Sequence, residues 1–221
     1  MIKKPCSCLL LASLLALSGC SQKVHDIGDS LRVAALGYND VPLTRQQVAA
    51  LPYAAIQLKW GHGPRVLSAL ALAEGEQLKW VTQDKKMLVT QHGRLIKTLG
   101  FEQDLVYTGN LSADPLPRLL TLMQQRQDLR WASEQDWQPG YISGYTSVSR
   151  FEYNGEESQN ILGTPVRLVK FTEHVRYSKF NRQLQNTFWL SPDSGKVIKS
   201  RQFIGPGQPE VEITFIKPYQ P

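Results

Sequence analysis

Residues 145–153, Tyr-Thr-Ser-Val-Ser-Arg-Phe-Glu-Tyr, decide the fold class because aromatic and polar side chains alternate along them. Phe151 falls on one side of an extended chain, whereas Arg150 and Glu152 fall on the other. A period of two is typical of a strand with one buried face. Residues 210–217 have the same period, since Val, Ile and Phe alternate there with Glu and Thr. The chain therefore favours β-structure.

Further strands are predicted on both sides of these segments, and short turn sequences separate them. Turns are expected at Glu74-Gly75, His92-Gly93, Asn154-Gly155 and Pro192 to Gly195, because Gly, Asn and Asp tolerate the backbone angles of tight turns. The other predicted strands span residues 54–60, 66–73, 78–82, 87–91, 94–99, 165–177, 186–191 and 196–204. Strands at this spacing predict an antiparallel meander that is curled into a barrel-like domain or a sandwich.

Two short helices interrupt this mainly β pattern. Thr44 and Gln47 have the spacing of a capping box, and Pro52 prevents a helix from continuing past it. A second helix is predicted after Asp114, where Leu and Met residues at 119–123 supply an apolar side. No internal repeat and no linker divides the chain, so a single domain is expected.

The first twenty residues carry an export signal. A basic start precedes an almost wholly apolar run at residues 9–17, and Leu17-Ser-Gly-Cys20 closes it with small residues before a cysteine. The run is shorter than the roughly 20 residues that a transmembrane helix needs. The pattern resembles a bacterial lipoprotein signal, which implies cleavage before Cys20, a lipid on its sulfur and an acylated new amino terminus.

This resemblance divides the chain into three parts. Residues 1–19 are the signal peptide, residues 20–30 hold the lipidated Cys20 and a short tether, and residues 31–221 form one β-rich periplasmic domain. Several acyl chains anchor a protein stably, since each buried CH₂ contributes about 0.8 kcal/mol. In the enterobacterial lipoprotein pattern an aspartate after the cysteine signals inner-membrane retention, so Ser21 implies the outer membrane. The compartment excludes nucleic acid as a partner.

The motifs of common enzyme classes are missing from the sequence. The four histidines, His25, His62, His92 and His174, lack the spacing of metal ligands. No nucleophile elbow or phosphate-binding glycine loop occurs. The carboxylate pairs Glu102/Asp104 and Glu134/Asp136 are interpreted as solvated loop charges. The sequence therefore predicts no catalytic residues, no metal and no cofactor.

Tryptophan side chains can stack on sugar rings, and the chain has five of them. In a β protein of this size most are expected in the core or at its rim. Trp131 and Trp137 flank a predicted polar loop, so they are stronger candidates for sugar stacking than Trp60 and Trp80, which fall in apolar strands.

Positive charge is concentrated between residues 165 and 201, where eight basic residues oppose two acidic ones and give a local net charge of +6. The basic residues are Arg167, Lys170, Arg176, Lys179, Arg182, Lys196, Lys199 and Arg201. A localised basic face attracts an acidic polysaccharide, lipid phosphates or an acidic partner. Lysines also protect the edge of a sheet from aggregation. The sequence leaves both interpretations open.

Residues 188–202, Phe-Trp-Leu-Ser-Pro-Asp-Ser-Gly-Lys-Val-Ile-Lys-Ser-Arg-Gln, combine an aromatic strand, a Pro-Asp-x-Gly turn and a strand that ends in Ser-Arg-Gln. This stretch resembles the group 4 capsule polysaccharide lipoprotein family of the GfcB/YjbF type. The resemblance implies a non-enzymatic outer-membrane lipoprotein that acts as an accessory or scaffold in capsule or exopolysaccharide assembly or export. Its implied partners are an outer-membrane export protein and an acidic polysaccharide. A lipid or acyl carrier, similar to lipoprotein-localisation proteins, is the alternative.

The lipidation signal generates the first prediction. Replacing Cys20 by Ala removes the thiol that receives the lipid, so we expect an uncleaved, unlipidated precursor that is lost from the outer-membrane fraction. Intact mass and membrane fractionation measure both effects. Cys8→Ala, in the discarded segment, is the matched control and is expected to mature normally. Cleavage and outer-membrane sorting of the Cys20→Ala variant would contradict the interpretation.

Overall fold

The computed structural model describes residues 43–140, 142–179, 183–205 and 207–220. The predicted signal peptide, Cys20, the tether at residues 20–30 and Arg182 lie outside the described residues. Among the described residues, no helix is long and apolar enough to cross a membrane.

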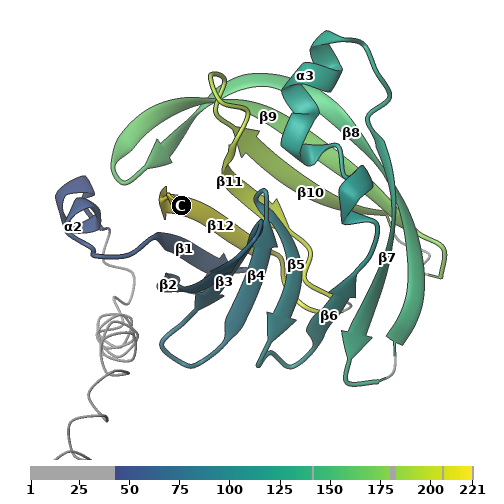
Figure 1. Cartoon of the computed structure of the whole chain (residues 1–221), viewed down its shortest axis with the longest axis horizontal. Helices are drawn as coiled ribbons and strands as arrows, with labels where there is room; N and C mark the ends of the chain where they lie inside the picture. The colour runs from purple at the N-terminus through teal and green to yellow at the C-terminus, as the bar shows by residue number, and fades with distance from the viewer. Residues whose placement is uncertain (1–42, 141, 180–182, 206, 221) are drawn as a thin grey trace, which may run out of the picture.

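Twelve strands form one antiparallel sheet that curls into a nearly closed barrel (Figure 1). They are β1 (Ala55–Trp60), β2 (Arg65–Glu74), β3 (Gln77–Val81), β4 (Met87–Gln91), β5 (Arg94–Leu99), β6 (Asp104–Thr108), β7 (Arg130–Gln138), β8 (Ile142–Ile161), β9 (Thr164–Tyr177), β10 (Gln183–Leu190), β11 (Val197–Gln202) and β12 (Val211–Lys217). Except for β5 and β6, strands that are consecutive in the chain are neighbours in the sheet, and β12 pairs with β1. The ends of the sheet are β5 and β6.

Side chains close the seam between β5 and β6. The Thr98 hydroxyl accepts a hydrogen bond from the Leu105 N–H at 2.9 Å and donates one to Asp104 at 2.9 Å. Thr108 donates to the Ile96 carbonyl, also at 2.9 Å. Asp104 is therefore part of the seam, and its interpretation as a solvated loop charge is wrong.

The predicted antiparallel barrel is confirmed, with two differences. The alternating pattern predicts neither β6 nor β7, because β6 is short and bulged and β7 turns polar side chains such as Ser133 inward. The predicted turn at Asn154-Gly155 is wrong, because β8 continues through a bulge there. Gly155 has a positive φ of 86° within that bulge, and the chain turns instead at Leu162-Gly163.

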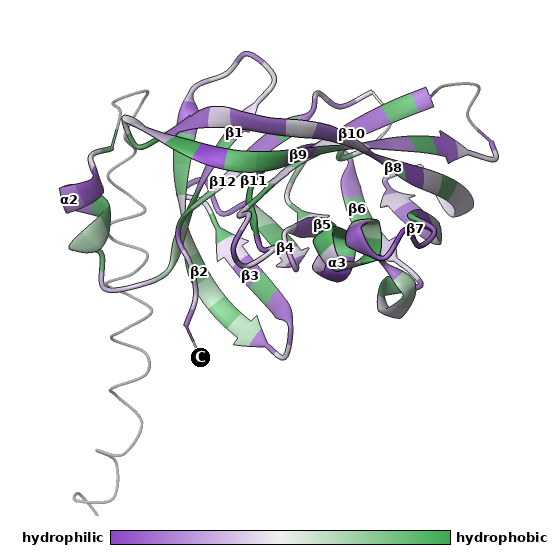
Figure 2. Cartoon of the chain, turned by 90° about the horizontal axis from the view of Figure 1, so that it is seen from above, coloured by the Kyte–Doolittle hydropathy of each residue, from purple (hydrophilic) through white to green (hydrophobic). Residues whose placement is uncertain are grey.

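The two predicted helices are confirmed as α2 (Arg45–Ala49) and α3 (Leu119–Gln124), and two 3₁₀ turns, η1 (Leu111–Ala113) and η2 (Leu116–Arg118), precede α3. The capping box of α2 forms as expected, since the Gln47 N–H donates to the Thr44 hydroxyl at 3.2 Å and the Thr44 N–H donates to Gln47 at 2.8 Å. Leu116 and Leu119 pack against Phe171 and Phe188. The η2–α3 segment thus plugs one end of the barrel (Figures 1 and 2).

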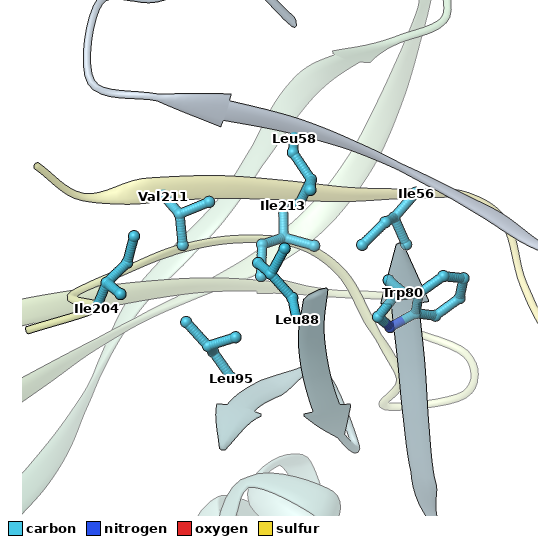
Figure 3. Packing of buried hydrophobic residues seen from close by; sticks show 8 residues of the cluster. All are labelled: Ile56, Leu58, Trp80, Leu88, Leu95, Ile204, Val211 and Ile213. Atoms are coloured by element: carbon cyan, nitrogen blue, oxygen red, sulfur yellow. The ribbon is translucent and has the colours of Figure 1, made fainter. Parts of the chain in front are cut away.

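Large apolar side chains fill the barrel interior. Ile56, Leu58, Trp80 and Leu88 are fully buried in one cluster, and they point toward one another from β1, β3 and β4 (Figure 3). Trp80 also donates a hydrogen bond to the Thr90 hydroxyl at 2.8 Å. A second cluster lies around Trp137. The interior is consequently a packed core, as expected for a barrel in which side chains occupy the central space.

Three charged residues, Arg94, Asp114 and Glu173, lie within this core. The guanidinium of Arg94 on β5 binds Asp114, next to η1, with two hydrogen bonds of 2.5 and 3.0 Å. It binds Glu173 on β9 with two more, of 2.9 and 3.2 Å. Its Cζ lies 4.2 Å from the centre of the Trp131 ring. Arg94 therefore joins β5 to β9 through the barrel interior, and both to the segment that leads into the plug.

Neighbouring groups donate further hydrogen bonds to the carboxylates of Asp114 and Glu173. Asn186 donates to Glu173 at 2.8 Å, and the Leu116 N–H donates to Asp114 at 3.0 Å. Burial lowers the pKa of Arg94, but Asp114 and Glu173 more than offset this and raise that pKa above its ordinary value. Arg94 is therefore charged. Burial also raises the pKa of the Tyr177 phenol, and the nearby Glu173 carboxylate adds to the rise.

The buried ion pairs generate the second prediction. Arg94→Met keeps much of the side-chain volume but leaves Asp114 and Glu173 buried without a cation, which costs about 3–5 kcal/mol in the free energy of unfolding. Urea denaturation measures the loss. The deficit should shrink as pH falls, because protonation removes the charge of the orphaned carboxylates.

Lys97→Met is the matched control, because Lys97 is an exposed residue of the same strand. Its effect should stay within about 0.5 kcal/mol. An Arg94→Met variant as stable as the control at neutral pH would show that the buried ion pairs do not stabilise the fold.

Candidate binding surface on the outer wall

The predicted basic face is divided by the structure into paired and unpaired residues. Four of its members form ion pairs with glutamates: Arg167 with Glu156, Lys170 with Glu157 at 3.4 Å, Lys199 with Glu212 at 3.1 Å, and Arg201 with Glu212 at 3.4 Å and Glu210 at 4.0 Å. These glutamates lie in or next to β8 and β12, outside the segment whose charge was counted. Much of the local charge of +6 is therefore balanced by neighbouring strands.

The remaining members lie in different places. Lys179 follows β9 and donates to the Ser143 carbonyl at 3.3 Å, with its Nζ 4.8 Å from the centre of the Tyr145 ring. Lys196 is exposed in the turn before β11. Arg176 is exposed near the end of β9. Unpaired positive charge thus covers a smaller area than the basic face that the sequence predicts.

The β8–β9 hairpin supplies the partners of two of these charges, since Glu156 pairs with Arg167 and Glu157 with Lys170. Beyond the bulge it arches across the outside of the barrel toward α2 (Figure 1). Its tip residue Leu162 packs with Leu43 and Val48 on the outer side of β1 and β2. The Trp189 indole, which faces outward from β10, donates to Glu157 of the hairpin. Lys199 donates to Gln159 at 3.2 Å.

A concave surface opens on the part of the wall that the arched hairpin leaves uncovered. Its volume is about 610 Å³. It is lined by outward-facing residues of β8, β9 and β10 with parts of two inward-facing ones: Val148, Ser149, Arg150, Glu152, His174, Val175, Arg176 and Gln183. We call it the arginine surface. Sequence reasoning includes Arg176 in the basic face but misses Arg150, because the strand that carries it precedes the basic segment.

Two arginines face one another on this wall. Arg130 on β7 is directly opposite Arg150 on β8, and Arg150 is directly opposite His174 on β9. Arg130 is paired with Asp128 at 3.1 Å. Within the described residues, neither Arg150 nor Arg176 has a carboxylate within ion-pair distance, in contrast to the four paired basic residues. Like charges directly opposite each other destabilise a sheet, so this arrangement favours a bound anion.

His174 links the acidic and polar groups of the surface. Its Nε2 lies 2.8 Å from Glu152, and its Nδ1 lies 3.4 Å from the Gln185 amide nitrogen. This geometry fits an Nε2–H that donates to the carboxylate and an Nδ1 that accepts from the amide. Glu152 is thereby directed toward His174 and leaves the two arginines without an acidic partner.

The tryptophans predicted for sugar stacking are buried, and that prediction is wrong. Trp131 and Trp137 are 4% and 1% exposed, because both point inward from β7. Trp131 covers Arg94, and the Trp137 indole donates to the Ile204 carbonyl at 2.8 Å. The polar residues between Trp131 and Trp137 belong to β7, and their side chains face outward or line the core. This segment is therefore a strand and not a loop.

The described part of the chain contains no group of three or more His, Cys, Asp or Glu side chains arranged to hold a metal ion. Of the predicted loop carboxylates, Glu134 and Asp136 are in fact residues of β7, and Asp136 accepts a hydrogen bond from the Gly144 N–H at 2.7 Å.

Comparison with known proteins places the chain in a family. The model of the group 4 capsule polysaccharide lipoprotein family, GfcB and YjbF, matches residues 28–216. This chain belongs to that family. Two relatives from Escherichia coli (strain K12) are the uncharacterized lipoprotein GfcB, 35% identical over 95% of this chain and 98% of its own, and the uncharacterized lipoprotein YjbF, 34% identical over 98% of each.

A solved structure agrees with the fold. The crystal structure of the hypothetical lipoprotein YmcC from Escherichia coli (K12) superposes with a TM-score of 0.75 at 34% sequence identity. The match covers 92% of this chain and 99% of that one. The predicted resemblance to a capsule polysaccharide lipoprotein family is confirmed.

The contact between the arched hairpin and the barrel generates the third prediction. The Trp189 hydrogen bond holds the pKa of Glu157 below its ordinary value, against the opposing effect of burial. Trp189→Phe removes the N–H donor, so we expect the pKa of Glu157 to rise, measured by NMR titration of the side-chain carboxyl. Because the folded-state pKa is lowered, the stability that this bond contributes is present at neutral pH and is lost as pH falls through it.

Trp60→Phe is the control, because it removes an indole from β1, away from the hairpin. It should leave the Glu157 titration unchanged. An unchanged pKa in the Trp189→Phe variant would contradict the role assigned to the indole.

Proposed function

We propose that this protein is a non-enzymatic, lipid-anchored accessory protein on the periplasmic face of the outer membrane, where it assists the assembly or export of capsule or another exopolysaccharide. Membership of a capsule polysaccharide lipoprotein family over residues 28–216 supports the polysaccharide link. The lipidation signal at Cys20 and the residue Ser21 support the anchor and the choice of membrane.

The packed interior is the observation that carries the accessory role. Trp80, Phe171 and Phe188 are fully buried inside the barrel, and the plug covers one end of it. Arg94, in the middle of the interior, forms ion pairs with Asp114 and Glu173. The outer wall is what remains for contact with a partner or a polymer, so we assign binding to that wall.

The carrier alternative needs a different interior. A lipid or acyl carrier requires an apolar hollow of several hundred Å³. The cavity of about 610 Å³ lies on the outer wall and is lined by Arg150, Arg176 and Glu152, which suit a polar ligand. We therefore retain the accessory role.

The proposal is tested in the host cell. Deleting the gene should lower the amount of polysaccharide at the cell surface, and the wild-type gene should restore it. Cys20→Ala should fail to restore it at equal protein abundance, because an unanchored domain no longer reaches its partners at the membrane. Arg167→Gln, which alters one exposed ion pair, is the matched control and should restore production.

Two further outcomes would overturn the proposal. Unchanged surface polysaccharide in the deletion strain would remove the accessory role. Shortening of the isolated polysaccharide by the purified lipoprotein would make the protein an enzyme.

A further inference from the structure

We propose that the arginine surface binds a carboxylated segment of a polysaccharide, with Arg150 and Arg176 holding the carboxylates. The inference rests on the proposed function, because it names the class of polymer that the outer wall takes and the residues that take it. It differs from the predicted basic face in its location and in its central residue, Arg150.

The first argument is charge. Arg130 and Arg150 occupy one row on two neighbouring strands, which lie about 4.8 Å apart. Arg176 lies in the next row, opposite Val148. The carboxylates nearest to this group are already paired, Asp128 with Arg130 and Glu152 with His174. The positive charge of Arg150 and Arg176 is therefore open to an external anion.

The second argument is the contrast with the other arginines of the wall. Arg167 and Arg201 are 78% and 50% exposed at their side chains, yet each is paired with a glutamate. Neutralising exposed arginines is thus the general arrangement on this wall, and the arginine surface departs from it. Arg presents a planar fork of donors that matches a carboxylate with two parallel hydrogen bonds.

The third argument is the chemistry around the two arginines. Val148 is 55% exposed and offers an apolar patch between them, which suits the C–H face of a sugar ring. Gln183 lines the same surface and supplies an amide group that pairs with a sugar hydroxyl. Charge, an amide and an apolar patch in one concave surface match an acidic sugar better than a bare inorganic anion.

The fourth argument is rigidity. The strands under the surface turn Ser149, Phe151, Glu173 and Val175 into the core, and all four are buried. Glu173 is fixed by Arg94 from the opposite wall. A surface built on such strands holds its side chains in place before the ligand arrives, which lowers the entropy cost of binding.

The experiment measures binding of the full-length lipoprotein, purified in detergent micelles, to immobilised oligogalacturonate, a carboxylated sugar polymer. Wild-type protein should bind it, bind neutral dextran at least tenfold more weakly, and lose affinity as salt is added, because ionic strength screens exposed charges. Arg150→Gln/Arg176→Gln should weaken binding of oligogalacturonate at least tenfold.

Arg167→Gln/Arg201→Gln is the matched control, since it removes two exposed arginines from the same wall that are already paired. It should bind within twofold of wild type. Equal losses in the two double variants, or equal binding of dextran and oligogalacturonate, would overturn the proposal. So would selective loss of binding to phosphatidylglycerol vesicles with unchanged binding to the sugar polymer, since that outcome makes the surface a lipid site.

Complementation separates this inference from the proposed function. If the deletion strain lacks surface polysaccharide and Arg150→Gln/Arg176→Gln restores it fully, the accessory role stands and the polymer site is overturned. If the deletion has no effect on polysaccharide, the proposed function falls whatever the binding assay shows.

Discussion

The ion pairs of Arg94 with Asp114 and Glu173 are the interaction on which the rest of the structure depends. They join β5, the strand at the seam, to β9 and to the segment that leads into the plug. A guanidinium this deeply buried needs a charged partner, and here two carboxylates bind it while donors such as Asn186 satisfy their remaining acceptor sites. The network occupies the middle of the barrel, so the interior supports the fold and recognition is left to the outer wall.

The outer wall is organised by the arched β8–β9 hairpin. One bulge lets a strand of 20 residues leave the barrel and lie across its neighbours. There Glu156 and Glu157 pair with basic residues of β9, and Gln159 accepts a hydrogen bond from Lys199 of β11. The same bulge leaves the other half of β8 in the barrel, where Arg150 remains uncovered. The bulge therefore accounts both for the pairing of Arg167 and for the exposure of Arg150, whereas Arg201 is paired by Glu210 and Glu212.

Local patterns predict local structure here, and they fail where distant residues determine it. The capping box at Thr44 and the strand at residues 94–99 need only neighbouring residues, and both are confirmed. Asn154-Gly155 has turn chemistry, but pairing with β9 makes it a bulge. Arg94 reads as an ordinary strand residue, because its partners are 20 and 79 residues away. For the same reason, counting charge over residues 165–201 misses the glutamates that neutralise it.

The division between a supporting interior and a recognising outer wall is tested most directly by NMR. Oligogalacturonate is titrated into the isotope-labelled lipoprotein in micelles, and shifts are followed at backbone amides and tryptophan indoles. Shifts at residues 148–152, 174–176 and 183, with the Trp80 and Trp131 indoles unmoved, are the predicted result. Shifts of those two indoles without change on the outer wall would contradict it, because the ligand would then enter the barrel.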